Sequence, residues 1–251
     1  MMTIGADQVW VEDSGGEGTP VVLLHPGIGD SRVWDDLWPA LVDQRRAVRY
    51  DVRGYGRSPD ATESYAALDD LIAVLDGLGV ARAHLVGASM GGGTAMDAAV
   101  LHPERVASLL LLAPGVHGYP WPDQPDVDAE YERLDAEGDI DGLVAYAMSI
   151  WTAAGTDAPV ADLMRGAVRA WSNEGEFQRD DEPTFDRLGE IAVAAVLMVG
   201  DLDNPPLVAA DLAAAQRIPG CRLVMLPGVD HLPMMREPEQ VLAELLALSA
   251  S

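Results

Sequence analysis

The stretch GASMG at 87–91 places Ser89 between two glycines, and its hydroxyl is a possible nucleophile. Gly-x-Ser-x-Gly between a strand and a helix is the nucleophile-elbow pattern, in which a strained turn lifts the serine hydroxyl clear of the backbone. Glycines are needed because neighbouring backbones come close at the turn and a Cβ would clash. The pattern predicts that Ser89 is a nucleophile, although an ordinary strand-to-helix turn could have the same sequence.

A serine hydroxyl attacks poorly without a base, and the chain has five histidines. His231 lies in LPGVDHLPMMREP, on a loop just after the last expected strand, and loops at the carboxyl ends of strands carry the chemistry of α/β proteins. His84 begins the strand that leads to Ser89 and belongs to the wrong end of the sheet, while His102 ends a helix. We therefore predict that His231 is the base, with His117 a weaker candidate.

The acid that orients the histidine should also follow a strand. The stretch VLMVGDLDNPP offers Asp201 and Asp203 directly after an apolar run, and either one satisfies the chain order nucleophile, acid, histidine. An oxyanion needs backbone N–H donors as well. We expect one from Met90, at the start of the helix after the serine, and one from Gly27 or Ile28 in the stretch HPGIGD.

The elements that must position these residues follow from hydrophobic patterning. Short apolar runs bounded by turn residues predict strands buried on both faces, and helix-period stretches lie between them. This alternation predicts an α/β, doubly wound fold with a mostly parallel sheet of about eight strands flanked by helices. An antiparallel strand pair near 2–13 is expected at the sheet edge, turning at DSGGEGTP. The other expected strands are 21–25, 47–52, 84–87, 108–113, 195–200 and 222–226, and the expected helices are 63–78, 91–102, 205–216 and 237–249.

A long segment without a strand candidate interrupts this alternation. It is too long for a loop in a compact domain, and it contains several helix-like pieces with aromatic residues. We predict a helical cap (lid) at 115–190 inserted into a core domain formed by 1–114 and 191–251; an ordinary helical excursion is the alternative. Such a cap would close an apolar substrate pocket, although each candidate could instead pack in the core. The candidate lining residues are Trp34, Met148, Trp151, Met164 and Trp171.

Five motifs in the right order resemble the α/β-hydrolase family, over about residues 9–248. LLHPGIGDSRVWD resembles its oxyanion loop, YDVRGYGRS its Asp-x-Arg-Gly-x-Gly-x-Ser motif, VGASMGG its nucleophile elbow, GDLD its acid turn and GVDHLPMMREPEQV its histidine loop. The resemblance implies a triad of Ser89, Asp203 and His231, because Asp203 occupies the fourth position of the acid turn. It also implies that the arginine motif at 51–58 is structural.

The oxyanion loop departs from the family pattern. The family commonly has His-Gly where this chain has His25, Pro26 and Gly27. Proline has no N–H to donate, so the loop amide must come from Gly27 or Ile28. Gly27 is favoured by its position in the motif.

The resemblance implies acyl transfer to Ser89. The epoxide hydrolases and haloalkane dehalogenases of this fold are disfavoured because they use Asp at the elbow. The expected substrate is a small or medium apolar carboxylic ester or lactone. Alternatives that stay open are a C–C bond hydrolase or enol-lactonase with the same triad, a cofactor-free haloperoxidase-like perhydrolase, and a non-enzymatic small-molecule-binding protein.

Composition limits the possible partners. The chain has 41 acidic and 16 basic residues, all of the latter arginine, and a formal charge of -25. This charge repels phosphates and anionic lipids, so we expect neither a nucleic acid nor a membrane as a partner. Cys221 is the only cysteine, and neither a metal nor a cofactor is expected. The first residues lack signal-peptide features, and the longest apolar run is too short to span a bilayer, so a cytoplasmic protein is expected.

Overall fold

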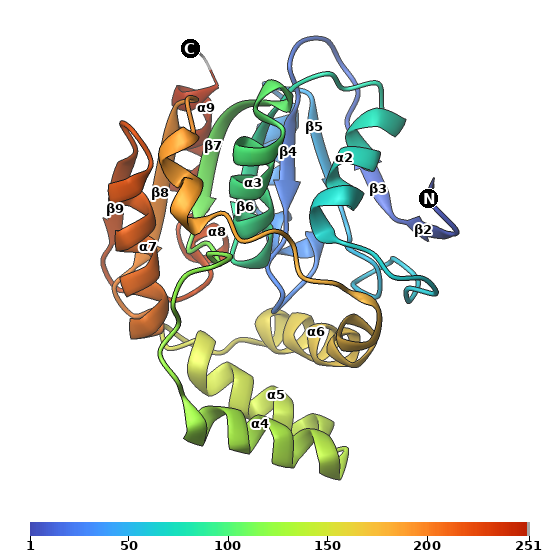
Figure 1. Cartoon of the computed structure of the whole chain (residues 1–251), viewed down its shortest axis with the longest axis vertical. Coiled ribbons are helices and arrows are strands. Elements are labelled where there is room, and N and C mark those ends of the chain that lie inside the picture. The colour runs from blue at the N-terminus through green and yellow to red at the C-terminus, as the bar shows by residue number, and fades with distance from the viewer. Residues whose placement is uncertain (250–251) are drawn as a thin grey trace.

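Seven strands form the central sheet of the protein (Figure 1). In chain order they are β3 (Val11–Asp13), β4 (Val21–Leu24), β5 (Ala47–Tyr50), β6 (Ala83–Ala88), β7 (Val106–Leu112), β8 (Ala195–Gly200) and β9 (Arg222–Leu226). Their order across the sheet is β3-β5-β4-β6-β7-β8-β9, and only the β3–β5 pair among them is antiparallel. The computed structural model describes residues 1–249, without the side chain of Ser172. This order confirms the predicted α/β doubly wound fold.

Helices cover both faces of the sheet, which explains the continuous apolar strands. In β4, Val22 packs into one hydrophobic cluster, whereas its neighbours Val21 and Leu23 pack into the other, because successive side chains of a strand point to opposite faces. The first cluster lies under α2, α3 and α7, and the second lies under α1 and α9. These helices are α1 (Trp38–Val42), α2 (Ala67–Gly77), α3 (Met90–Leu101), α7 (Pro205–Arg217) and α9 (Pro238–Leu248).

The N-terminal strands differ from the prediction. Strands β1 (Met2–Ile4) and β2 (Asp7–Val9) form a separate antiparallel hairpin, so the main sheet has seven strands and not about eight. The hairpin turns at Gly5, whose positive φ of 60° suits a two-residue connection. The predicted turn at DSGGEGTP is therefore wrong: that stretch links β3 to β4, and β3 alone reaches the sheet edge.

Three α-helices and a short 3-10 helix (Phe185–Glu190) lie between β7 and β8, within the stretch for which a cap is predicted. The α-helices are α4 (Pro125–Glu137), α5 (Ile140–Trp151) and α6 (Ala158–Phe177), and Figure 1 shows them gathered beyond one end of the sheet, with α6 nearest to it. Side chains of Asp139 and Asp157 cap the N-termini of α5 and α6. Most buried residues of these helices join the second cluster, whereas Ala167 and Ala170 of α6 join the first. Those in the second cluster are Leu134, Leu143, Val144, Ala147, Val160, Leu163, Met164 and Val168.

Candidate active site

Ser89 occupies a strained turn between β6 and α3. Its φ of 48° and ψ of -116° are unusual for a residue with a side chain, and such strain persists where the surrounding structure enforces it. The flanking glycines are required: a Cβ at Gly87 would collide with the carbonyl oxygen of Gly91, and a Cβ at Gly91 would lie 2.5 Å from that of Leu24. The turn thus has the geometry that the Gly-x-Ser-x-Gly pattern predicts.

A histidine and a carboxylate meet at the ends of two neighbouring strands. Asp203 follows β8 and His231 follows β9, and His231 Nδ1 lies 2.9 Å from Asp203 Oδ2. Both side chains are buried. Because an ionised carboxylate only accepts hydrogen bonds, we assign the proton to Nδ1, which leaves Nε2 of His231 as the acceptor. This is the tautomer that a general base needs.

Asp201, the other candidate acid, does not contact the histidine. It is exposed, and its Oδ1 accepts a hydrogen bond of 2.6 Å from the backbone N–H of Gly228. Asp201 therefore shapes the connection between the β8 and β9 loops. The geometry pairs His231 with Asp203.

A cavity of about 400 Å³ brings the predicted nucleophile and base together. Its size suits a small ligand. Among the described residues Ser89 Oγ has no hydrogen-bond partner, so we expect its hydrogen bond to His231 to form when substrate binds. The lining residues are Gly27, Ile28, Tyr55, Ser89, Met90, Tyr131, Trp151, Trp171, Glu174 and His231.

Not all of the predicted pocket residues reach this cavity. Trp151 and Trp171 line it, and the ring of Trp151 packs against His231 with centroids 4.6 Å apart. Trp34 and Met164 are completely buried in the second hydrophobic cluster, and Met148 packs against that cluster. The prediction that Trp34 and Met164 line the pocket is therefore wrong, because their side chains are buried in the core, and Met148 is not among the residues that line this cavity.

The two predicted oxyanion donors lie side by side. Met90 is the first residue of α3, where helical N–H groups have no intrahelical partner. A Cβ built on Gly27 would lie 3.7 Å from Met90 Sδ, so the loop and the helix start are in contact. The carbonyl of Gly27 accepts a hydrogen bond of 2.8 Å from Trp171 Nε1, which fixes the peptide between Gly27 and Ile28. A side chain of α6 thus holds the oxyanion loop.

The neutral imidazole of His25 holds the same loop in place. Its Nε2 accepts a hydrogen bond of 3.0 Å from the Val52 N–H, so its Nδ1 carries the proton and donates to the Pro26 carbonyl at 2.9 Å. Both ring nitrogens are occupied, which excludes His25 as the base.

The arginine motif at 51–58 braces the surrounding loops. Asp51 accepts hydrogen bonds from the N–H groups of Ser31 and Arg57, at 2.8 and 2.9 Å. Arg53 forms buried ion pairs with Asp7 and Asp70, at 2.6 and 2.8 Å. These contacts agree with the structural role that the resemblance implies.

Three cavity residues were not predicted: Tyr55, Tyr131 and Glu174. The hydroxyl of Tyr55 donates a hydrogen bond of 2.5 Å to Glu174 Oε2, and burial raises the pKa of both groups. Glu174 follows Trp171 by three residues on α6, a spacing that places both on one face of a helix. That spacing could have indicated Glu174 from the sequence. Tyr55 lies within the arginine motif at 51–58, to which only a structural role was given.

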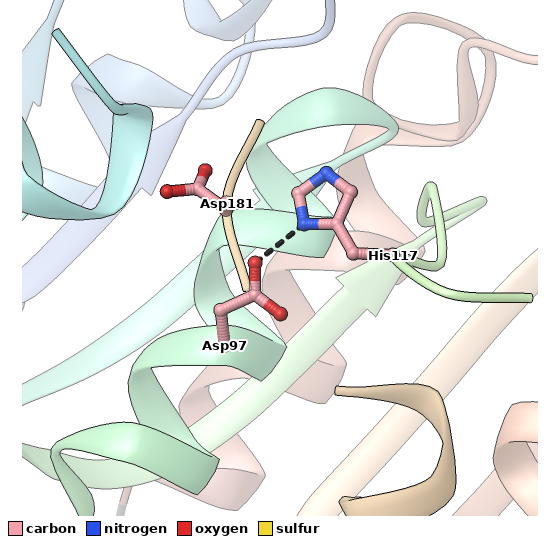
Figure 2. A group of neighbouring side chains, drawn as sticks. All are labelled: Asp97, His117 and Asp181. Carbon is pink, nitrogen blue, oxygen red and sulfur yellow. Dashed lines mark hydrogen bonds and ion pairs between the residues drawn. The ribbon is translucent and has the colours of Figure 1, made fainter. Parts of the chain in front are cut away.

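A group of possible metal ligands lies outside this cavity. Asp97, His117 and Asp181 each offer a ligand atom, all within 4.8 Å of one another (Figure 2). Both carboxylate oxygens of Asp97 are already bonded, to His117 Nδ1 and to Thr184 Oγ1, each at 2.5 Å. The carbonyl of His117 also accepts from the N–H groups of Thr184 and Phe185. We interpret this group as an anchor that ties both ends of the inserted segment to α3.

The remaining histidines are structural. His84 Nδ1 lies 2.8 Å from Ser108 Oγ, inside the sheet and away from the cavity. His102 follows the last residue of α3 and caps that helix. The hydrogen bond from His117 to Asp97 raises the pKa of His117. Of the five histidines, His231 alone lines the cavity with Ser89.

The mostly parallel sheet, the strained serine turn and the Asp–His pair at the strand ends together are the features of the α/β-hydrolase fold. A family model described as "Alpha/beta hydrolase family" matches residues 21–245. The chain belongs to the α/β-hydrolase family. Among the described residues no helix is both long and apolar enough to cross a membrane.

Similar proteins include esterases and a lactone-degrading enzyme. The pimeloyl-[acyl-carrier protein] methyl ester esterase of Aeromonas hydrophila is 28% identical over 240 residues, which is 90% of this chain and 93% of that protein. The acetyltransferase component of an acetoin cleaving system from Pseudomonas putida is 44% identical over 108 residues, and the match spans 41% of this chain and 29% of that protein. A solved N-acyl homoserine lactone degrading enzyme is 26% identical, with a TM-score of 0.80 and 98% of each chain covered.

Proposed function

We propose that this enzyme is a serine hydrolase that cleaves a small or medium apolar carboxylic ester or lactone through an acyl-enzyme on Ser89. One observation carries the proposal. Ser89, on its strained turn, shares an aromatic cavity with His231, whose Nδ1 is held by the buried Asp203. The ester-cleaving and lactone-degrading activities in the names of the similar proteins agree with this chemistry.

Each residue has a defined part in the reaction. Ser89 Oγ attacks the carbonyl carbon while His231 Nε2 takes its proton, and Asp203 stabilises the resulting imidazolium. The N–H groups of Met90 and Gly27 stabilise the oxyanion. His231 then gives the proton to the leaving alcohol oxygen as the C–O bond breaks. Water, deprotonated by His231, attacks the acyl carbon, and the proton returns to Ser89 as the acid leaves.

Labelling with an organophosphate tests this proposal directly. Diisopropyl fluorophosphate should form one adduct, on the peptide that contains Ser89, and ester hydrolysis should be lost in proportion to labelling. The adduct is located by mass spectrometry, and the heat-unfolded protein is the control because it lacks an activated serine. Full ester turnover by a protein that stays unlabelled would contradict the proposal. The C–C bond and enol-lactone alternatives use the same serine, so a panel of such substrates beside simple esters separates them.

The cap should select the substrate without cleaving it. Because Trp171 lines the cavity, Trp171→Ala should enlarge it and change the ratio of kcat/KM for octanoate and acetate esters by about tenfold in favour of octanoate. Trp171→Phe, which keeps most of the ring but loses the N–H to Gly27, should change chain-length preference less and lower kcat through a looser oxyanion loop. The assay compares 4-nitrophenyl esters of increasing chain length.

Trp121→Ala is the matched control, since Trp121 is exposed within the same inserted segment and is absent from the cavity lining. It should leave the chain-length profile unchanged. Equal loss of activity on every ester by Trp171→Ala, together with a sharply lowered unfolding midpoint, would instead make Trp171 a core residue.

A further inference from the structure

The lining of the substrate cavity combines aromatic rings with a single carboxyl group. Tyr55, Tyr131, Trp151 and Trp171 contribute the rings, and Glu174 contributes the carboxyl. Neither arginine nor lysine is among the lining residues that the structure describes. The only basic side chain in the lining is that of His231.

Glu174 has no cationic partner. Its Oε2 accepts the hydroxyl hydrogen of Tyr55, and within residues 1–249 neither an ion pair of Glu174 nor a donor to its Oε1 is found. His25 lies nearby, but its two ring nitrogens are bonded to backbone groups in the neutral form. A half-buried carboxylate that faces a cavity without a counter-ion favours a cation that enters it.

The aromatic rings that line the same cavity as Glu174 favour the same kind of ligand. The face of an aromatic ring carries negative potential and attracts ammonium groups, and quaternary ammonium ligands are bound by such clusters of rings. The formal charge of -25 acts in the same direction at longer range, because it draws cations and repels carboxylates. The local and the long-range electrostatic potentials therefore both favour a cationic ligand.

We propose that Glu174 and the aromatic rings of the cavity lining form a subsite for an alkylammonium group, so that the preferred substrates are esters or lactones that carry such a cation. This inference rests on the proposed function, since it names the class of ester that Ser89 cleaves. Glu174 acts as a specificity residue and takes no part in bond cleavage. Substrates with a carboxylate at this position are rejected.

Isosteric esters that differ only in charge test the subsite. Choline butyrate and 3,3-dimethylbutyl butyrate place a cation or a neutral tert-butyl group in the alcohol. Methyl 4-(trimethylammonio)butanoate and methyl 5,5-dimethylhexanoate place them in the acyl chain. The measured quantity is the ratio of kcat/KM for the cationic and the neutral ester of each pair. In at least one pair the wild type should cleave the cationic ester at least as well as the neutral one, and a wild type that strongly prefers the neutral ester in both pairs overturns the proposal.

Glu174→Gln should lower this ratio about tenfold in the pair whose charge reaches the subsite, because the amide keeps the shape and the acceptor for Tyr55 but loses the charge. Glu176→Gln is the matched control: Glu176 is exposed on the same helix two residues further on, and its replacement changes the net charge equally. A ratio that falls only in Glu174→Gln supports the subsite. A ratio that is unchanged in Glu174→Gln, or that changes equally in both variants, overturns it, and a lower unfolding midpoint with an unchanged ratio makes Glu174 merely a structural partner of Tyr55.

Inhibition of the wild-type protein by small ions tests the subsite without a variant. Butyltrimethylammonium should inhibit ester hydrolysis competitively and at least tenfold more strongly than hexanoate, whereas equal inhibition would contradict the proposal. The outcomes for the subsite and for the proposed function are separable. If wild-type protein cleaves the neutral esters and shows no charge preference, the serine hydrolase stands and the subsite fails. If it cleaves none of the esters, the proposed function fails.

Discussion

Replacing Ser89 with alanine should lower ester hydrolysis by about six orders of magnitude, as removal of the nucleophile does in a serine protease. Only the attacking oxygen is lost, since His231, Asp203 and the backbone donors stay in place. The fold should be unchanged, because Ser89 Oγ has no hydrogen-bond partner among the described residues and alanine has the same Cβ at the strained φ. The measurement is turnover of 4-nitrophenyl butyrate by the purified variant, with the circular dichroism spectrum and the unfolding midpoint as checks of folding.

Ser149→Ala is the control for this experiment. Ser149 is exposed on α5 and bonds only locally, to the carbonyl of Tyr146, so its replacement should leave turnover and folding unchanged. Undiminished hydrolysis by Ser89→Ala would place the nucleophile elsewhere and remove the basis of the mechanism.

The elements of the fold were predictable where one local rule decides the structure. The run at 195–200 is apolar at every position, and it forms a strand buried on both faces. The serine turn was predictable because only glycine tolerates the backbone contacts on either side of it. The N-terminal hairpin was not predictable, because Gly5 and the glycines of DSGGEGTP are equally good turn formers. The sequence therefore does not show which strands pair.

Side-chain partners in the cavity were harder to predict than backbone elements. Trp34 and Trp151 are the same residue type, yet the first is buried in the core and the second lines the cavity. Periodicity tells which residues share a helix face, but tertiary packing decides what that face meets. Glu174 is one of 41 acidic residues, and its partial burial and its hydrogen bond from Tyr55 distinguish it from its exposed neighbours on the helix.

Replacing the acid of the triad should also have a large effect. Asp203→Asn should lower kcat by about four orders of magnitude, whereas Asp201→Asn should change kcat by no more than about twofold. An asparagine amide that donates to Nδ1 of His231 favours the tautomer with the proton on Nε2, and that nitrogen then cannot accept the serine proton. The same exchange in a serine protease has this effect. The measurement is kcat for 4-nitrophenyl butyrate with each purified variant.

Asp201→Asn is a matched control because it makes the same chemical change two residues away. Asp201 is exposed and serves as an acceptor for the Gly228 N–H, a bond that the asparagine carbonyl oxygen can also accept. The loop should therefore keep its shape while the triad stays intact. Since Asp203 Oδ2 lies 2.9 Å from His231 Nδ1, the large loss must follow the residue that touches the imidazole. A reversed ranking, with Asp201→Asn the slower enzyme, would mean that the acid turn rearranges in solution so that Asp201 orients the histidine.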